Sequence, residues 1–358
     1  MSFINATSWN NLQGSNVTND KRFSQLGVVD LAADSTSFVD YILPSQVTQM
    51  NTMSSLRSLE IPVIDDQSVT VLTTPGFEFI PANLETSAKY SFTCYDVFSG
   101  FRHYPAAYAN NMVDANAALE IKMRNIAYAC GKQMETIILS TLSTQKSQAL
   151  DFTTQVSQGD GTFTFSTLTD TLTVNKAAQK ETMFFYLEDL MAANELAGNY
   201  RIVTNRAGLA VQKAERLKYS TNNDKNIDAL GFFDLSRMYE SGSISAGSDV
   251  FSGYIVRDGG IGIIPNFPYD FVNGTEIGGK KWSITDMELP YCRMRANVYV
   301  NNEATNATAL ITAGTDSNTI MTHFQEMAIW LRFYVVYRYN SDLANRANDI
   351  VKIVGATS

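Results

Sequence analysis

Charged side chains are scarce in this chain of 358 residues: Asp, Glu, Lys and Arg together make up 18%, against roughly 25% in a typical soluble domain. Acids outnumber bases by 36 to 27, and the formal charge of −9 argues against a dedicated nucleic-acid reader, because such a surface repels phosphate. Aromatic residues are plentiful, with 20 Phe, 17 Tyr and 3 Trp. A chain that replaces charge with aromatic and amide side chains often buries much of its surface against other chains.

Cysteines and long apolar runs are also few. The three cysteines, Cys94, Cys130 and Cys292, lie far apart in the sequence, which predicts buried reduced thiols rather than a disulfide framework or a metal knuckle. No apolar run approaches the ~18 residues of a membrane-spanning helix. The first residues lack the basic and then apolar pattern of a secretory signal. We therefore expect a chain that is made in a reducing cytoplasm and has no membrane partner.

Residues suited to catalysis are sparse. The two histidines, His103 and His323, have no second histidine or cysteine at ligand spacing, and no nucleophile elbow or phosphate-binding loop occurs. The glycine cluster at 259–262 predicts a turn rather than a dinucleotide site. We interpret the carboxylate pairs as ordinary solvated acids. These pairs are Asp65-Asp66, Glu188-Asp189 and Asp286/Glu288. The sequence predicts no enzyme, catalytic residue, cofactor or metal, and a hydrolase with an unrecognised carboxylate pair stays a remote alternative.

The first 57 residues have the composition of an extended arm. Residues 1–40 are rich in Asn, Ser and Thr, and their few apolar anchors are spaced for neither a helix nor a strand. Such a segment orders only when something holds it. We expect a neighbouring subunit to hold this arm.

Residues 58–104 are predicted to form a two-stranded excursion. Apolar and polar residues alternate over 69–74, Pro75-Gly76 breaks the run, and a second strand signal covers 89–94. Two strands alone are marginal and need another surface to lie on. The candidate contacts between subunits in the arm and the excursion are Phe3, Trp9, Phe77, Phe79, Lys89, Tyr90 and Phe92.

The clearest elements are a helix at 113–145 and a strand at 327–339. Apolar residues recur at spacings of three to five along the helix, which at 1.5 Å per residue spans about 45 Å. The strand has a continuous apolar face of similar length, so we expect the two to pack together. Between 165 and 320 helices and strands alternate. We expect helices at 181–197 and 206–217, a short strand at 200–204, and two strands within 282–300 that are joined near Pro290.

The order of these elements resembles the major capsid proteins of tailed phages, the Hong Kong ninety-seven fold. The passage Phe101–Pro105 into Asp114–Asn116 and the helix Leu119–Leu142 is similar to the family's entry into its spine helix. Asn199–Asn205 followed by Gly208-Leu209 is similar to the entry into its axial lobe. The resemblance implies an α+β fold with these parts: an N-terminal arm at 1–57, an extended β-loop at 58–104, a peripheral domain with the spine helix at 105–199, an axial α/β domain at 200–315, and a return strand and C-terminus of the peripheral domain at 316–358.

The resemblance also implies a function. It implies a virion structural protein, assembled in the host cytoplasm, whose hexamers and pentamers build an icosahedral shell around double-stranded DNA. The implied partners are copies of itself, a portal, decoration proteins, and packaged DNA through weak non-specific contact. Residues 1–40 lack the charged helical scaffolding segment that many relatives cleave, which predicts an uncleaved chain and a separate scaffolding protein.

Other readings of the same sequence stay open. An encapsulin-like nanocompartment shell shares the fold and encloses enzyme cargo, and a tail-tube or decoration protein is another virion component. Some shells of this type weld their subunits through a lysine–asparagine bond, and Lys89 lies on the excursion. No partner asparagine or carboxylate stands out, so a solvated or salt-bridging Lys89 is favoured.

Overall fold

The structure is a computed structural model, and it is described over part of the chain. The residues described are 22, 25–34, 42, 44–52, 58–64, 87–103, 115–150, 163–175, 183–196, 198–211, 233–245, 251–266, 276–277, 280–289, 294–301, 308–310, 319–321, 325–340 and 343–356. Phe3, Trp9, Phe77, Phe79, His323 and the strand expected at 69–74 lie outside them.

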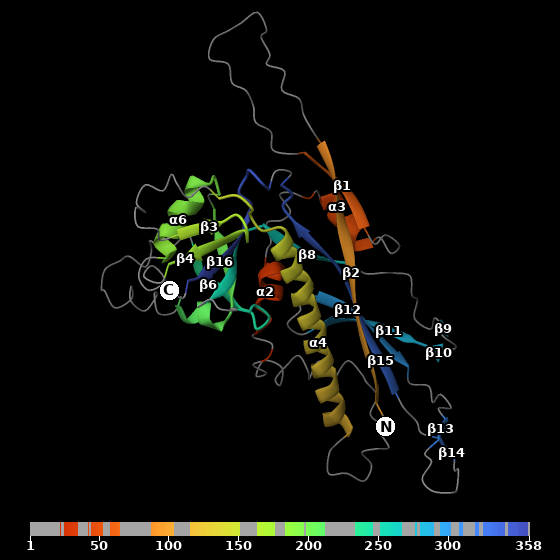
Figure 1. Ribbon diagram of the computed structural model, residues 1–358. Helices are drawn as coiled ribbons and strands as arrows, with labels where there is room; N and C mark the ends of the chain where they lie inside the picture. Colours follow the sequence, from red (N-terminus) through yellow and green to blue (C-terminus); the bar gives the residue numbers. More distant parts are fainter. Residues whose placement is uncertain are drawn as a thin grey trace, which may run out of the picture.

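The fold is α+β, as predicted, and contains two six-stranded sheets (Figure 1). The first is antiparallel in the order β1-β2-β15-β12-β11, with β8 also beside β15. Its strands are β1 (Ser58–Ile64), β2 (Ser87–His103), β8 (Ile261–Pro265), β11 (Ser283–Leu289), β12 (Met294–Asn301) and β15 (Gln325–Tyr337). The strand predicted at 327–339 and the strand pair predicted near Pro290 are thereby confirmed.

The second sheet is mixed and has the order β3-β4-β16-β7-β5-β6. Its strands are β3 (Phe163–Ser166), β4 (Thr171–Val174), β5 (Tyr200–Thr204), β6 (Phe233–Glu240), β7 (Ser252–Arg257) and β16 (Ile350–Gly355). Two short hairpins complete the strands: β9 (Glu276–Ile277) with β10 (Lys280–Lys281), and β13 (Thr308–Leu310) with β14 (Thr319–Met321). Neither large sheet comes from one continuous stretch, since each draws strands from both sides of residue 200.

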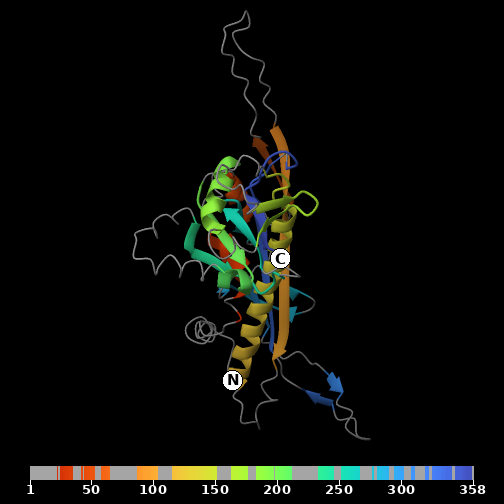
Figure 2. The same cartoon turned by 60° about the vertical axis from the view of Figure 1, so that its left-hand side comes forward.

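The predicted long helix is α4 (Ala115–Thr144), which lies along the first sheet in both views (Figures 1 and 2). A row of its side chains, each at most 1% exposed, recurs every three or four residues: Leu119, Met123, Ala127, Cys130, Met134, Ile138 and Leu142. This row packs in the main core against β2 and against Ile329, Leu331 and Phe333 of β15. The expected packing of helix and strand is confirmed. Burial of an aliphatic side chain of this size stabilises by about 1.5–3 kcal/mol.

The sequence prediction was wrong for residues 27–34, which were read as part of an extended arm. They form α2 (Gly27–Asp34), and its side chains Val28, Val29 and Leu31 lie in the main core beside α4. Gly27 begins this helix against the backbone of Glu240, where an added Cβ would lie 2.4 Å from the carbonyl oxygen. The short apolar run was overlooked because it stands among polar residues.

The second sheet is covered on both faces. One face contributes Val203, Tyr254 and Val256 to the main core, and the other packs against α6 (Met183–Ala193) through residues such as Ile202 and Ile255. The expected strand at 200–204 is confirmed, and the helix expected at 206–217 is helical over 206–211, beyond which lie residues outside the described part. The glycine cluster after β7 is a turn, as predicted, with Gly259 at φ 84°.

Two buried carboxylates connect the parts of the core. Asp349, 1% exposed, accepts from Arg257 at the end of β7 at 3.5 Å and from Arg338 just after β15 at 3.4 Å. Glu135 of α4, also 1% exposed, accepts from the hydroxyls of Ser241 at 2.6 Å and Ser243 at 2.7 Å. Burial of a charge without such partners costs several kcal/mol, so these contacts fix how α4 and the first sheet meet the second.

Glu135 gives a pH prediction. Burial raises the pKa of its carboxyl, and the hydroxyls of Ser241 and Ser243 offset part of that rise. Because the folded pKa exceeds the unfolded one, the stabilising contribution of Glu135 is complete below the unfolded pKa and is lost as pH rises through the folded pKa. We expect the free energy of unfolding of the wild type, minus that of Glu135→Gln, to fall between pH 4 and pH 7.

The measurement is urea unfolding of the unassembled chain across that pH range. Glu120→Gln removes one carboxylate from a half-buried position on the same helix and serves as the matched control. A difference for Glu135→Gln that stays constant or grows with rising pH contradicts the assignment.

Candidate functional site

The most distinctive surface feature is a two-stranded ribbon that extends past the rest of the first sheet. β2 pairs with β1 through residues 87–93 and with β15 through residues 94–103, so one strand belongs half to the ribbon and half to the body. Figures 1 and 2 show the ribbon running beyond the end of α4. Among the described residues, β1 has no strand partner other than β2. Residues 94–103 of the excursion expected at 58–104 therefore form a central strand of the chain's own sheet.

An aromatic cluster braces the base of the ribbon. The Tyr90 ring lies 5.0 Å from Phe92, 5.4 Å from Tyr337 and 4.4 Å from Tyr339 between centroids. The hydroxyls of Tyr90 and Tyr337 are hydrogen bonded. The pairs of Tyr90 with Phe92 and with Tyr337 are edge-to-face, and such pairs add about 0.5–1.5 kcal/mol each beyond area burial. Burial raises the pKa of Tyr337 to about 12, so its hydroxyl stays protonated at neutral pH.

The helix α3 (Pro44–Thr52) also packs against the base of the ribbon. Phe92 is 3% exposed and shares a small core with Met50 of α3, Ile264 of β8 and Tyr334 of β15. Asn266 donates a hydrogen bond to the carbonyl of Met50, which fixes α3 beside β8. The ribbon therefore leaves the body in a defined direction.

The candidate contact residues at the ribbon base occupy different environments. Phe92 and half-buried Tyr90 pack within their own subunit. Lys89 is 79% exposed and lies 3.8 Å from Glu60, which is 66% exposed. An ion pair this exposed contributes little to stability. Three of the seven candidates, Lys89, Tyr90 and Phe92, lie in the described part of the chain, and Lys89 is the one whose side chain is exposed.

Sequence reasoning missed the uncovered face of the first sheet. Phe98 is 67% exposed and stands opposite Trp330 in the register of β2 and β15. Asp96 accepts from Trp330 Nε1 at 3.0 Å and from Arg332 Nε at 2.8 Å, and the Arg332 guanidinium lies 4.9 Å from the Trp330 ring. The signal was present, because β15 alternates its apolar row with Trp330 and Arg332. This face therefore presents aromatic side chains to solvent, and the charged side chains of Asp96 and Arg332 beside them are already paired with each other.

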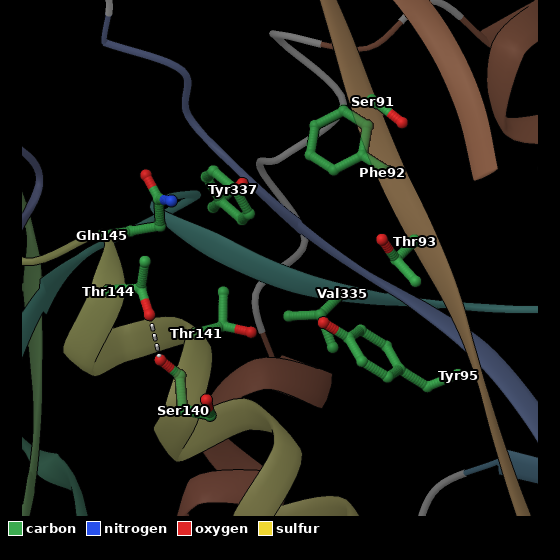
Figure 3. Close-up of a pocket in the computed structure, with 10 residues that line it drawn as sticks. All are labelled: Ser91, Phe92, Thr93, Tyr95, Ser140, Thr141, Thr144, Gln145, Val335 and Tyr337. Carbon is green, nitrogen blue, oxygen red and sulfur yellow. Dashed lines mark hydrogen bonds between the residues drawn. The ribbon is translucent and has the colours of Figure 1, made fainter.

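A hollow of about 130 Å³ lies between β2, the last turns of α4 and β15 (Figure 3). Its lining is Ser91, Phe92, Thr93, Tyr95, Ser140, Thr141, Thr144, Gln145, Val335 and Tyr337. These ten side chains include no carboxylate, imidazole, amine or thiol. Thr144 turns its hydroxyl back onto the carbonyl of Ser140 at 2.9 Å (Figure 3). The hollow can donate and accept hydrogen bonds, but its lining holds no carboxylate, imidazole or amine that could activate its hydroxyls as nucleophiles.

The residues considered for catalysis are placed as structural groups or lie outside the described part. His103 ends β2 and is 2% exposed, and burial followed by the charge of Lys122 lowers its pKa. Asp189 is exposed on α6, and the side chains of Glu188, Asp286 and Glu288 are outside the description. Cys94 and Cys130 are free and buried, as predicted, and burial raises the pKa of each thiol to about 11.

The described residues offer neither a metal site nor a membrane-spanning helix. No group of three or more His, Cys, Asp or Glu side chains that could hold a metal ion occurs in the described ranges. None of the described helices combines the length and apolar character needed to cross a bilayer.

Comparison with known proteins gives matches among solved structures. No family model matches the chain, and no curated protein matches it. The Cyanophage Pam1 capsid asymmetric unit is 8% identical, with 91% of this chain and 94% of that chain covered and a TM-score of 0.48. The capsid structure of Cyanophage P-SCSP1u is 11% identical, with 86% of each chain covered and a TM-score of 0.44.

The mature capsid of bacteriophage PhiM1 is also similar, at 10% identity over 86% of each chain with a TM-score of 0.44. These TM-scores lie below 0.5, so we draw the function from the ribbon, the sheet faces and the helix of this chain. All three of these structures are phage capsids.

The ribbon base yields a prediction. Phe92→Ala should lower the free energy of unfolding by about 3 kcal/mol or more, because it opens a cavity in a packed core. Tyr337→Phe keeps the ring contacts and removes one hydroxyl, so we expect a cost of about 1 kcal/mol. Amide hydrogen exchange should accelerate over residues 87–93 in Phe92→Ala.

The amides of β5, which lies in the other sheet, are the internal control for that experiment. Unchanged exchange at 87–93 in Phe92→Ala, or equal acceleration throughout the chain, would show that the cluster does not hold the ribbon.

Proposed function

We propose that this chain is the major capsid protein of a tailed phage, whose hexamers and pentamers form an icosahedral shell around double-stranded DNA. The observation that carries the proposal is the projecting β1–β2 ribbon. It is braced at its base by an aromatic cluster, and within the described part of the chain β1 and residues 87–93 of β2 pair only with each other. A two-stranded ribbon is marginal in water unless it rests on another surface.

Identical copies give such a ribbon a place to rest. When the ribbon of one copy lies on a different surface of the next, the contact is head to tail, and a fixed rotation between copies closes a ring. Each contact is modest, and many repeated contacts make a closed wall stable. Phe77, Phe79 and Lys89 on the excursion, with Phe3 and Trp9 in the arm, are our proposed contacts between neighbours.

The uncovered face of the first sheet supports association with protein. Exposed Phe98 and the partly buried Trp330 and Arg332 are aromatic residues and an arginine, the types enriched where binding energy concentrates in protein interfaces. Arg332 is paired with Asp96 at 2.8 Å, and Arg102 is paired with Glu326 at 2.8 Å. A protein that covers this face therefore leaves none of these four charges without a partner.

The composition fits a container wall. A chain with 18% charged residues and a net charge of −9 repels phosphate on most of its surface. We propose the virion as its location, with assembly in the host cytoplasm around a separate scaffolding protein, and a portal and decoration proteins as further partners. The domain boundaries stated from the sequence remain part of this proposal.

Electron microscopy of the purified full-length chain tests the assignment. We expect closed icosahedral particles, and particles recovered from infected cells should contain double-stranded DNA. Tubes would favour a tail-tube protein, and closed particles that hold protein cargo without DNA would favour an encapsulin-like shell. A chain that stays monomeric under all assembly conditions would refute the proposal.

Variants of the excursion give a sharper prediction. The double variant Phe77→Ala with Phe79→Ala should leave the circular dichroism and unfolding of the single chain unchanged and reduce the yield of closed particles. The matched control, Phe77→Tyr with Phe79→Tyr, keeps both rings and should assemble. Normal particles from the alanine variant would count against a contact between neighbours at these residues.

A further inference from the structure

One side of α4 faces solvent along the whole helix. Its exposed positions are Ala117, Ile121, Asn125, Ala129, Lys132, Gln133, Thr136, Ser140, Ser143 and Thr144. None of these ten is a carboxylate, although acids outnumber bases by 36 to 27 in the chain. The two acids of α4 are drawn away from this side: Glu120 is half-buried and Glu135 is buried among serines. The net charge of the solvent side of α4 is therefore positive, whereas the net charge of the chain as a whole is negative.

Three cations lie on or beside this side. Lys132 is exposed. Arg22 is held against the helix, with its guanidinium 5.1 Å from the Tyr128 ring and 3.3 Å from the side-chain oxygen of Asn125. Tyr128 and Lys132 are four residues apart, so Arg22 and Lys132 share one stretch of the helix surface.

Lys122 supplies the third cation, nearer the start of the helix. Its ammonium lies 5.8 Å from the Phe101 ring and 3.3 Å from the carbonyl of Arg102. Ten residues separate Lys122 from Lys132, or about 15 Å along the axis. Duplex DNA advances 3.4 Å per phosphate on each strand, so such a row spans roughly four phosphates.

We propose that the solvent side of α4 is the surface that contacts packaged duplex DNA, through Arg22, Lys122 and Lys132. This inference rests on the proposed capsid function and adds which face of the subunit lines the interior. The contact is weak and independent of sequence, because it pairs a few cations with phosphates. The short uncharged side chains between the cations let the duplex approach closely without reading its bases.

Salt dependence of DNA binding tests the proposal. Fluorescence anisotropy of a labelled 25-base-pair duplex is followed with the unassembled full-length chain between 50 and 200 mM NaCl. Three phosphate contacts predict a slope of log K against log salt of about −3, and Lys132→Ala or Lys122→Ala should each reduce it to about −2. Lys89→Ala removes one exposed lysine on the ribbon and controls for the loss of a single positive charge, so on the unassembled chain it should keep the wild-type slope.

Each other result overturns the inference. A wild-type slope near zero, unchanged slopes in both α4 variants, or an equal reduction in Lys89→Ala would show that α4 is not the DNA-contacting surface. Particle formation by the two α4 variants, followed by electron microscopy, separates this outcome from the proposed function. If shells form normally and the salt dependence of the α4 variants is unaltered, the role of α4 is refuted and the capsid assignment stands. If the wild-type chain forms no shells, the capsid assignment itself is refuted.

Discussion

The packing of α4 against β2 and β15 is the constraint on which the rest of this structure depends. Seven side chains in one row of the helix are at most 1% exposed, and they rest on the central strands of the first sheet. Burial of each leucine, isoleucine and methionine in this row stabilises by about 1.5–3 kcal/mol, so the helix and sheet form one stiff unit. β2 is then free to carry its first seven residues out of the body as a ribbon, because its last ten are anchored beside β15.

The two sides of this unit have different chemistry, which suits a wall. The sheet face turned away from α4 carries Phe98 and Trp330 with its charges paired internally, and it is suited to protein. The exposed side of α4 lacks carboxylates and carries Lys132, and it is suited to a polyanion. Buried Glu135 and Asp349 join the second sheet to this unit, so both faces keep a fixed orientation relative to the ribbon.

The long periodic elements could be predicted from the sequence. The apolar row of α4 and the alternation of β15 are strong signals, and their packing follows from matched length. α2 was missed because one short apolar run stands among Asn, Ser and Thr, and only the facing row of α4 makes it a helix. Glu135 and the pairing of Phe98 with Trp330 could not be predicted, since they depend on residues more than a hundred positions apart. The dual role of β2 likewise depends on a register that its own residues do not specify.

A cryo-electron microscopy map of assembled particles, at a resolution that shows side chains, tests the central claim most directly. The account predicts that residues 58–64 and 87–93 of each copy lie on the body of a neighbouring copy, and that the exposed side of α4 faces the lumen. Ribbons that fold back onto their own subunit, or an α4 that faces outward, would contradict it.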